Sequence, residues 1–173
     1  MVNLSNVCHS QFIGHQGRPG DTWHVDEMFV TINGDRHYLW RAVDQGRAVL
    51  DILVQKRRDQ LAATRFFRKL LKGLLYVPRL LVTDQLGSYR AARREVLASV
   101  AHWQDRRLNN RAEVSHQPTR QRERQMRGFK SPEQAQRVLL AHGPINGLFR
   151  CGRPLMRAAY YRVFREWAFV TWR

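Results

Sequence analysis

Apolar residues occupy most positions from Trp23 to Ile32, and the run ends at Asn33-Gly34. The stretch is rich in β-branched and aromatic residues, which favour strands. An Asn-Gly pair after such a run is a strong signal for a β-hairpin. The pattern therefore predicts a strand with two apolar faces, as in the middle of a sheet that is covered on both sides.

Two more apolar runs follow closely, over residues 37–43 and 48–54. Short turns separate all three runs, so they predict an antiparallel meander. Apolar residues then recur at helical spacing, and we expect a helix with Asp59 as its N-cap and Gly73 at its end.

A short apolar run over residues 79–84 comes next and ends in an acid. We expect a second helix over 88–97 and a fifth strand over 100–104. A strand–helix–strand passage of this length favours a crossover to a parallel neighbour. The order predicts an α/β fold, a mixed five-stranded sheet with helices on both faces, in which the first and fourth strands are neighbours.

The remaining chain is predicted to be helical. A basic loop leads into a helix that Pro118 kinks or restarts. Ser131-Pro132 opens a further helix that continues to Gly143-Pro144, and residues 155–172 form a last amphipathic helix. We expect a weakly ordered leader over residues 1–20 and one domain with C-terminal helices over 21–173.

Three acidic residues are placed to meet in this fold. Asp26 lies inside the first strand, where an ionised side chain is costly unless it is paired or bound to a metal. Asp84 ends the fourth strand at a carboxyl edge, where α/β sheets place ligands. Glu113 lies early on the helix after the fifth strand. Converging carboxylates suit hard divalent cations, and we expect two Mg²⁺ ions, with Mn²⁺ as an alternative.

Each acid also has a structural explanation. Asp84 suits an Asx-turn after a strand, and Glu113, three residues after Asn110, suits a capping box. Glu27 is next to Asp26 in the strand and points to the opposite face. Its position leaves open which of the two acids is functional.

Composition adds a strong positive charge. The 173 residues include 30 Lys and Arg against 14 Asp and Glu, a net charge of +16. A folded protein with this excess most often binds a polyanion, and nucleic acid is the leading candidate. No apolar run approaches the ~20 residues that cross a membrane, and two cysteines are too few for a disulfide framework. We therefore expect a cytoplasmic, nucleoid-associated protein.

Several motifs carry a family resemblance: W-H-V-D-E-M-F-V, L-W-R-A-V-D-Q, V-T-D-Q-L-G-S-Y, L-N-N-R-A-E-V-S-H-Q-P-T-R and R-G-F-K-S-P-E-Q-A-Q. From about Arg18 onward the chain resembles the DDE transposases of bacterial insertion-sequence family six. The resemblance implies an RNase H-like fold and Mg²⁺-dependent cleavage and strand transfer of DNA. It implies that the acidic triad is Asp26, Asp84 and Glu113, and that Arg120 contacts phosphate.

The resemblance also names partners and leaves alternatives. The partners would be insertion-sequence ends and target DNA, bound by a homo-oligomer. The DNA contacts expected from the basic run are Arg106, Arg107, Arg111, Arg120 and Arg124. Family members carry an N-terminal helix-turn-helix region, whereas about 20 dissimilar residues precede the core here, which predicts a truncated copy. The alternatives are an inactive DNA-binding remnant and a general RNase H-like nuclease.

Overall fold

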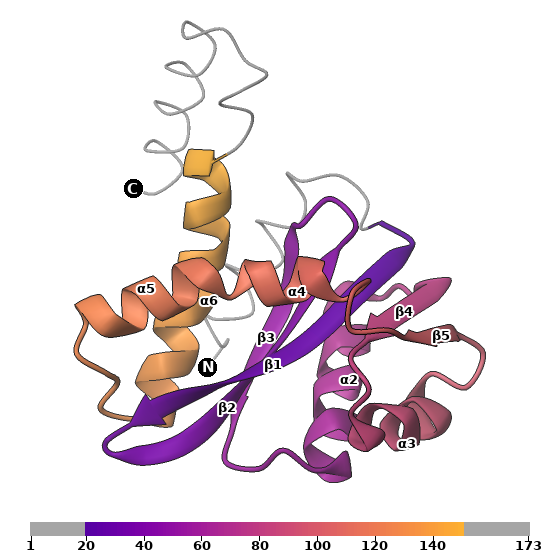
Figure 1. The fold of residues 1–173 in the computed structure, drawn as a ribbon, viewed down its shortest axis with the longest axis horizontal. Coiled ribbons are helices and arrows are strands. Elements are labelled where there is room, and N and C mark those ends of the chain that lie inside the picture. Colours follow the sequence, from indigo (N-terminus) through magenta and orange to yellow (C-terminus); the bar gives the residue numbers. More distant parts are fainter. Residues whose placement is uncertain (1–19, 151–173) are drawn as a thin grey trace, which may run out of the picture.

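The structure is a computed structural model that describes residues 20–150, and Figure 1 shows a twisted sheet with helices on both faces. The leader predicted before Gly20 and the helix predicted over residues 155–172 lie outside the described residues. The strands are β1 (Thr22–Ile32), β2 (Asp35–Asp44), β3 (Val49–Gln55), β4 (Leu80–Thr83) and β5 (Ala101–Gln104). Their order in the sheet is β3-β2-β1-β4-β5.

The strand pairing follows the predicted topology. β1, β2 and β3 are antiparallel neighbours, whereas β4 and β5 run parallel to β1. The β1–β2 turn uses left-handed backbone at Asn33 (φ 49°) and Gly34 (φ 87°), as an Asn-Gly hairpin requires. The predicted mixed five-stranded sheet, with the first and fourth strands adjacent, is confirmed.

The helices divide between the two sheet faces (Figure 1). They are α2 (Gln60–Leu74), α3 (Gly87–Val96), α4 (Asn110–Ser115), α5 (Gln117–Gln125) and α6 (Pro132–Arg150). The pair α2 and α3 covers one face, and α6 covers the other with α4 and α5 beside it. The sheet is therefore buried on both sides, which explains why β1 is apolar in both of its alternating sets of side chains.

Two hydrophobic cores result, one on each face. The larger core lies under α2 and α3, where Trp40 meets Tyr89 edge-on with ring centroids 5.5 Å apart. The smaller core joins Met28 and Val30 of β1 to Leu139 of α6. Alternate residues of β1 thus supply both cores, as the strand periodicity predicts.

The far half of β1 is covered by the end of α5 and the loop after it, in place of a strand. β4 pairs only with Thr22–Val25, so the β1 edge is open beyond that point. There the Thr31 amide donates to Glu123 Oε1 at 2.8 Å, and the Asn33 amide donates to the Phe129 carbonyl at 2.8 Å. These bonds satisfy edge amides that would otherwise lack a partner.

Two helix ends differ from the prediction. Gly73 lies inside α2, and Leu75 takes the left-handed conformation (φ 51°) that ends the helix. The predicted stop at Gly143-Pro144 is also wrong, because α6 continues through both residues to Arg150. Gly143 lies against Val49 of β3, so packing on the sheet favours continuing the helix where local propensity would end it.

In the described part of the chain, no helix is both long enough and apolar enough to cross a bilayer.

Replacing Phe66, fully buried in the larger core, tests which face of α2 carries the stability. Phe66→Ala is expected to lower the free energy of unfolding by about 3–5 kcal/mol, because it removes apolar contacts and leaves a cavity. Urea titration followed by circular dichroism measures this. The matched control is Leu61→Ala on the same helix, where Leu61 is 62% exposed and the expected change is within about 0.5 kcal/mol. Similar losses in both variants would contradict the assignment of faces.

Candidate metal centre

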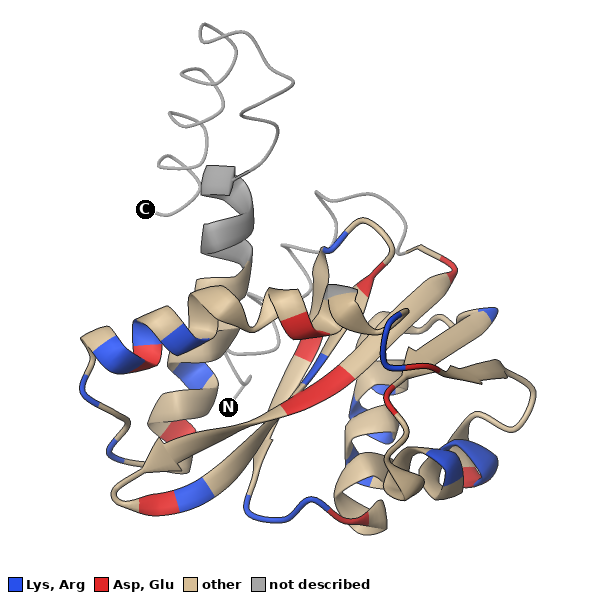
Figure 2. Ribbon diagram, viewed as in Figure 1, with Lys and Arg blue, Asp and Glu red and all other residues tan. Residues whose placement is uncertain are grey.

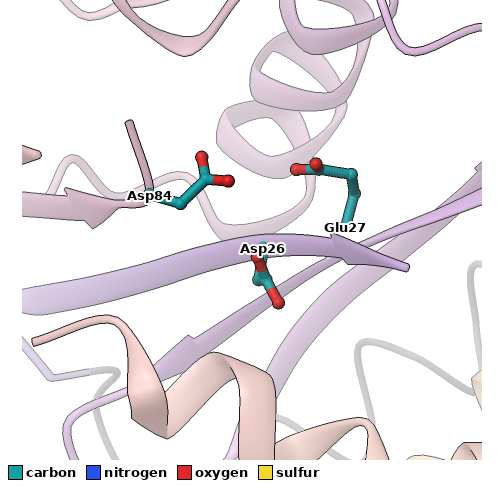
Figure 3. Close-up of side chains that lie close together, drawn as sticks. All are labelled: Asp26, Glu27 and Asp84. Carbon is teal, nitrogen blue, oxygen red and sulfur yellow. The ribbon is translucent and has the colours of Figure 1, made fainter. Parts of the chain in front are cut away.

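The register of β1 and β4 brings two aspartates together. Val25 is paired with Thr83 in the parallel ladder, so the next residues, Asp26 and Asp84, follow side by side where β4 ends. With Glu27 they form a group in which each residue offers a carboxylate oxygen, all within 4.8 Å of one another. Figure 3 shows Glu27 and Asp84 pointing toward each other, with Asp26 projecting from the other side of the strand.

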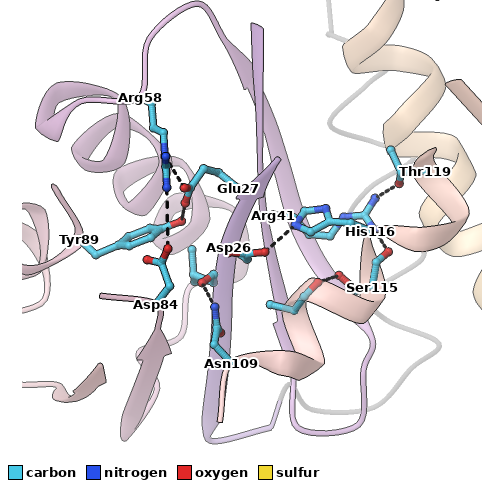
Figure 4. A network of polar contacts seen from close by, with 12 residues as sticks. Asp26, Glu27, Arg41, Arg58, Asp84, Tyr89, Asn109, Ser115, His116 and Thr119 are labelled. Carbon is cyan, nitrogen blue, oxygen red and sulfur yellow. Dashed lines mark hydrogen bonds and ion pairs between the residues drawn. The ribbon is translucent and has the colours of Figure 1, made fainter. Parts of the chain in front are cut away.

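Glu27 is the most enclosed of the three acids, with a side chain only 2% exposed. Its Oε2 accepts a hydrogen bond from the Tyr89 hydroxyl, and its Oε1 accepts one from Arg58 Nε at 2.5 Å. Arg58 also approaches Asp84, with Nη2 3.8 Å from Oδ2. A single guanidinium therefore stands between two acids of the group (Figure 4).

Asp84 forms an Asx-turn, which is the structural role that the sequence suggested for it. Its Oδ1 accepts from the Leu86 amide at 3.0 Å, which fixes the carboxylate at the start of the β4–α3 connection. The other oxygen, Oδ2, faces Arg58. The turn therefore orients the carboxylate and leaves one oxygen directed toward the acid group.

Asp26 faces a buried polar cluster on the opposite side of β1 (Figure 4). His116 Nε2, at the junction of α4 and α5, lies 3.3 Å from Asp26 Oδ2. Arg41, the cross-strand neighbour of Asp26 on β2, donates to the Ser115 carbonyl and, at 2.6 Å, to Thr119 Oγ1. Arg41 thus fastens the α4–α5 junction to the sheet directly beside Asp26.

The contact between His116 and Asp26 is not an ion pair. Burial, and then the positive charges of Arg41 and Arg120, hold the pKa of His116 well below its usual range. The imidazole is therefore neutral near pH 7, and its role beside Asp26 is to pack against and orient the carboxylate.

Glu113 lies on α4, on the same side of the sheet as this cluster. It is exposed and is not one of the three acids grouped within 4.8 Å, but its charge contributes to the raised pKa of Asp26. The capping-box explanation does not hold, because the N-cap of α4 is Asn109 and it makes no capping hydrogen bond. The Asn109 amide instead donates to the Val25 carbonyl at 3.0 Å, which ties the start of α4 to β1 beside the acids.

Burial, more than the nearby acids, changes the protonation of Asp26 and Glu27. Burial, followed by the charge of Asp84, raises the pKa of Asp26 to about 7. Burial also raises the pKa of Glu27 to about 7, although the Tyr89 hydrogen bond and the Arg58 charge oppose the increase. Asp26 and Glu27 are therefore partly protonated near neutral pH, and a divalent cation at Asp26 would compete with its proton. Carboxylate oxygens at this spacing are the ligands that hard cations such as Mg²⁺ prefer.

The predicted DNA-binding arginines lie in the loop before α4 and on the helices α4 and α5. Arg106 and Arg107 are exposed in the loop before α4, and Arg120 and Arg124 are exposed on α5. Figure 2 shows both segments rich in basic residues beside the acidic centre of β1. The side chain of Arg111 lies outside the described part of the structure. Their role in DNA binding remains a prediction.

Arg120 also lies over an exposed aromatic ring. Its guanidinium carbon is 6.0 Å from the centroid of the Phe29 ring, and that of Arg36 is 5.4 Å away. This stacking holds Arg120 close to β1, three residues along the strand from Asp26.

Sequence reasoning missed several residues of this centre. Arg58 is one basic residue among many in a loop, and Tyr89 fits the apolar side of a helix, so neither pattern singles them out. His116 likewise gives no signal. Arg41 gives one, because a charged residue within an apolar strand needs a buried partner.

The mixed five-stranded sheet, in the order β3-β2-β1-β4-β5 with helices on both faces, is an RNase H-like fold, and solved structures share it. The HTLV-2 integrase catalytic core domain in complex with magnesium superposes with a TM-score of 0.52 at 14% identity, covering 77% of this chain and 87% of that one. The BIV integrase catalytic core domain gives a TM-score of 0.54 at 14% identity, covering 89% and 99%. At these identities the likeness establishes the fold.

Sequence comparison gives the family. Residues 20–151 match the family described as DDE domain, and the chain belongs to this family, the catalytic domain of insertion-sequence family six transposases. The transposase for insertion sequence-like element IS431mec of Staphylococcus aureus is 33% identical over 99 residues, which are 54% of this chain and 44% of that protein. The match thus spans less than half the length of this relative.

The raised pKa of Asp26 predicts a pH-dependent stability in the absence of metal. Its folded pKa of about 7 exceeds its ordinary value of 3.8, so the protonated carboxyl stabilises the fold at low pH. This contribution is lost as the pH rises through about 7, by up to ~4 kcal/mol relative to Asp26→Asn, which does not titrate there. Urea unfolding of both proteins in EDTA between pH 4 and pH 8 measures the difference. Parallel pH profiles would show that Asp26 is not perturbed.

Proposed function

We propose that this domain catalyses divalent-metal-dependent cleavage and strand transfer of DNA, as a DDE transposase. The observation that carries the proposal is the group of carboxylates formed where β4 ends beside the middle of β1, whose oxygens lie within 4.8 Å of one another. A basic protein with this charge balance suits DNA as the substrate. The family assignment of residues 20–151 supports the same reaction.

The donor set fits the cofactor. Asp26 and Asp84 offer oxygens from adjacent strands, and Glu113 on α4 would complete a set that holds two Mg²⁺ ions, or Mn²⁺. A cation there would offset both the burial and the charge of Asp84, which together raise the pKa of Asp26. Bound divalent ions supply activation of the attacking oxygen and charge stabilisation at the leaving oxygen in a phosphodiester displacement. The HTLV-2 integrase core is described in complex with magnesium, which supports a metal of this kind.

The choice of Glu113 over Glu27 as the third ligand rests on their hydrogen bonds. Both oxygens of Glu27 are engaged, one by Tyr89 and one by Arg58. Glu113 is exposed, and the buried bonds of Arg41 to the α4–α5 junction hold α4 against the sheet. We infer that Glu27 orients its neighbours while Glu113 binds metal.

The arginines of the basic run would hold the DNA backbone along α4 and α5. Arg106, Arg107, Arg111, Arg120 and Arg124 are the residues we propose for this role, with Arg120 next to the acids. Phosphate contacts of this kind make binding salt-sensitive and independent of sequence. We further propose that insertion-sequence ends and target DNA are bound by a homo-oligomer in the cytoplasm, associated with the nucleoid.

Asp84→Asn tests the acid group directly. We expect it to reduce Mg²⁺-dependent cleavage of insertion-sequence-end DNA at least ~100-fold, because it removes a charged ligand at the point where charge develops. We also expect Mg²⁺ to raise the melting temperature of the wild-type protein but not that of the variant. The control is Asp35→Asn, an exposed acid of the β1–β2 hairpin, for which both effects should be preserved. DNA binding by the wild type without any cleavage would indicate the inactive remnant instead.

A second pair of variants identifies the third ligand. Glu113→Gln is expected to abolish the Mg²⁺-induced increase in melting temperature, because it removes a ligand charge. Glu27→Gln should retain most of this increase, since the carboxyl there serves Tyr89 and Arg58. Differential scanning fluorimetry over a range of Mg²⁺ concentrations separates the two. The opposite result would assign the ligand to Glu27.

A further inference from the structure

Arg58 lies at the acid group without being one of the predicted DNA contacts. It comes from the β3–α2 loop, on the face of the sheet opposite α4 and α5, and its side chain is 42% exposed. Its Nε is committed to Glu27 at 2.5 Å. Its Nη2 is 3.8 Å from Asp84 Oδ2, which is too long for a hydrogen bond. The N–H groups of Nη2 can therefore donate to another acceptor.

The guanidinium is held in place by a chain of buried groups. Glu27, 2% exposed, is fixed on its other oxygen by the Tyr89 hydroxyl. Tyr89 is itself fully buried and packs edge-on against Trp40. A flexible arginine in a surface loop is thus given one position, at modest entropic cost when it binds a ligand.

The charge of Arg58 is secure. Burial lowers its pKa, but the charge and the hydrogen bond of Glu27 outweigh burial, and the pKa is raised overall. An arginine also presents several N–H donors in a planar fork that matches the oxygens of a phosphate. Arg58 therefore offers a permanent, oriented cation at the edge of an acidic group that would otherwise repel DNA.

We propose that Arg58 binds the phosphate of the DNA strand at the acid group, once divalent cations neutralise Asp84 and its neighbours. This inference rests on the proposed function. It gives Glu27 and Tyr89 a positioning role, because they aim the guanidinium. The phosphate contact distinguishes this role from a purely structural ion pair, in which Arg58 would only neutralise Glu27.

The test measures DNA binding with and without metal. A fluorescein-labelled 20-base-pair duplex is titrated with the full chain at constant ionic strength, in EDTA or in Mg²⁺, and the anisotropy gives both dissociation constants. A denaturing gel verifies that the strand is intact after each titration. For the wild type we expect binding to be at least tenfold tighter in Mg²⁺, since a charge-assisted phosphate contact has about this effect.

The variants isolate the contribution of Arg58. Arg58→Ala should lose this tenfold gain and Arg58→Lys most of it, because lysine lacks the planar fork. The matched control is Arg57→Ala in the same loop, where Arg57 is 82% exposed. It removes the same charge and should keep the Mg²⁺ gain within twofold of the wild type. Arg58→Ala leaves the buried Glu27 carboxylate without its cation, which could lower the melting temperature. The double variant Glu27→Gln/Arg58→Ala removes that unpaired charge. In this variant too, the Mg²⁺-dependent gain in DNA affinity should be absent.

Each outcome has a definite meaning. An equal Mg²⁺ gain in the wild type and in Arg58→Ala overturns the proposal, and so does a wild type that shows no gain. A gain that depends on Arg58, in a protein that never cleaves DNA on longer incubation with Mg²⁺ or Mn²⁺, supports the phosphate contact and refutes the proposed reaction. The two inferences are thereby tested separately.

Discussion

Parallel pairing of β4 with β1 over four residues sets the position of the acid group. The ladder ends with Val25 opposite Thr83, so the chain places Asp26 and Asp84 next to each other as the two strands part. Burial of Asp26, and then the nearby charge of Asp84, disfavour the ionised carboxylate, so the pKa of Asp26 is raised. The hydrophobic cores on both faces must supply the stability that keeps this register in place.

The two sides of β1 handle this charge differently. On one side Glu27 accepts hydrogen bonds from Tyr89 and Arg58, at the edge of the larger core. On the other side Asp26 meets a neutral His116. Arg58 lies beside Glu27 and Asp84, whereas the His116 ring beside Asp26 carries no charge, and the pKa of both Glu27 and Asp26 is raised to about 7. This asymmetry follows from the alternation of side chains along one strand.

The sequence was sufficient to predict the sheet and to predict that Asp26 and Asp84 lie close together in it. Apolar runs and an Asn-Gly turn define the strands, and an acid inside or at the end of such a run is recognisable because burial makes it costly. The helix ends were not predictable, since α6 continues through Pro144 and α2 ends at Leu75 for reasons of packing. Arg58 and His116 contact the acids only because the tertiary fold brings them there. Such contacts cannot be predicted from local sequence spacing.

The covering of β1 by the segment around Phe129 has a consequence for the behaviour of the chain in solution. An uncovered strand edge with free amides is a template for pairing with a second molecule, which leads to aggregation. Glu123 and the Phe129 carbonyl occupy the amides of Thr31 and Asn33. With these amides occupied, neighbouring copies of the chain have no exposed backbone at this edge through which to pair.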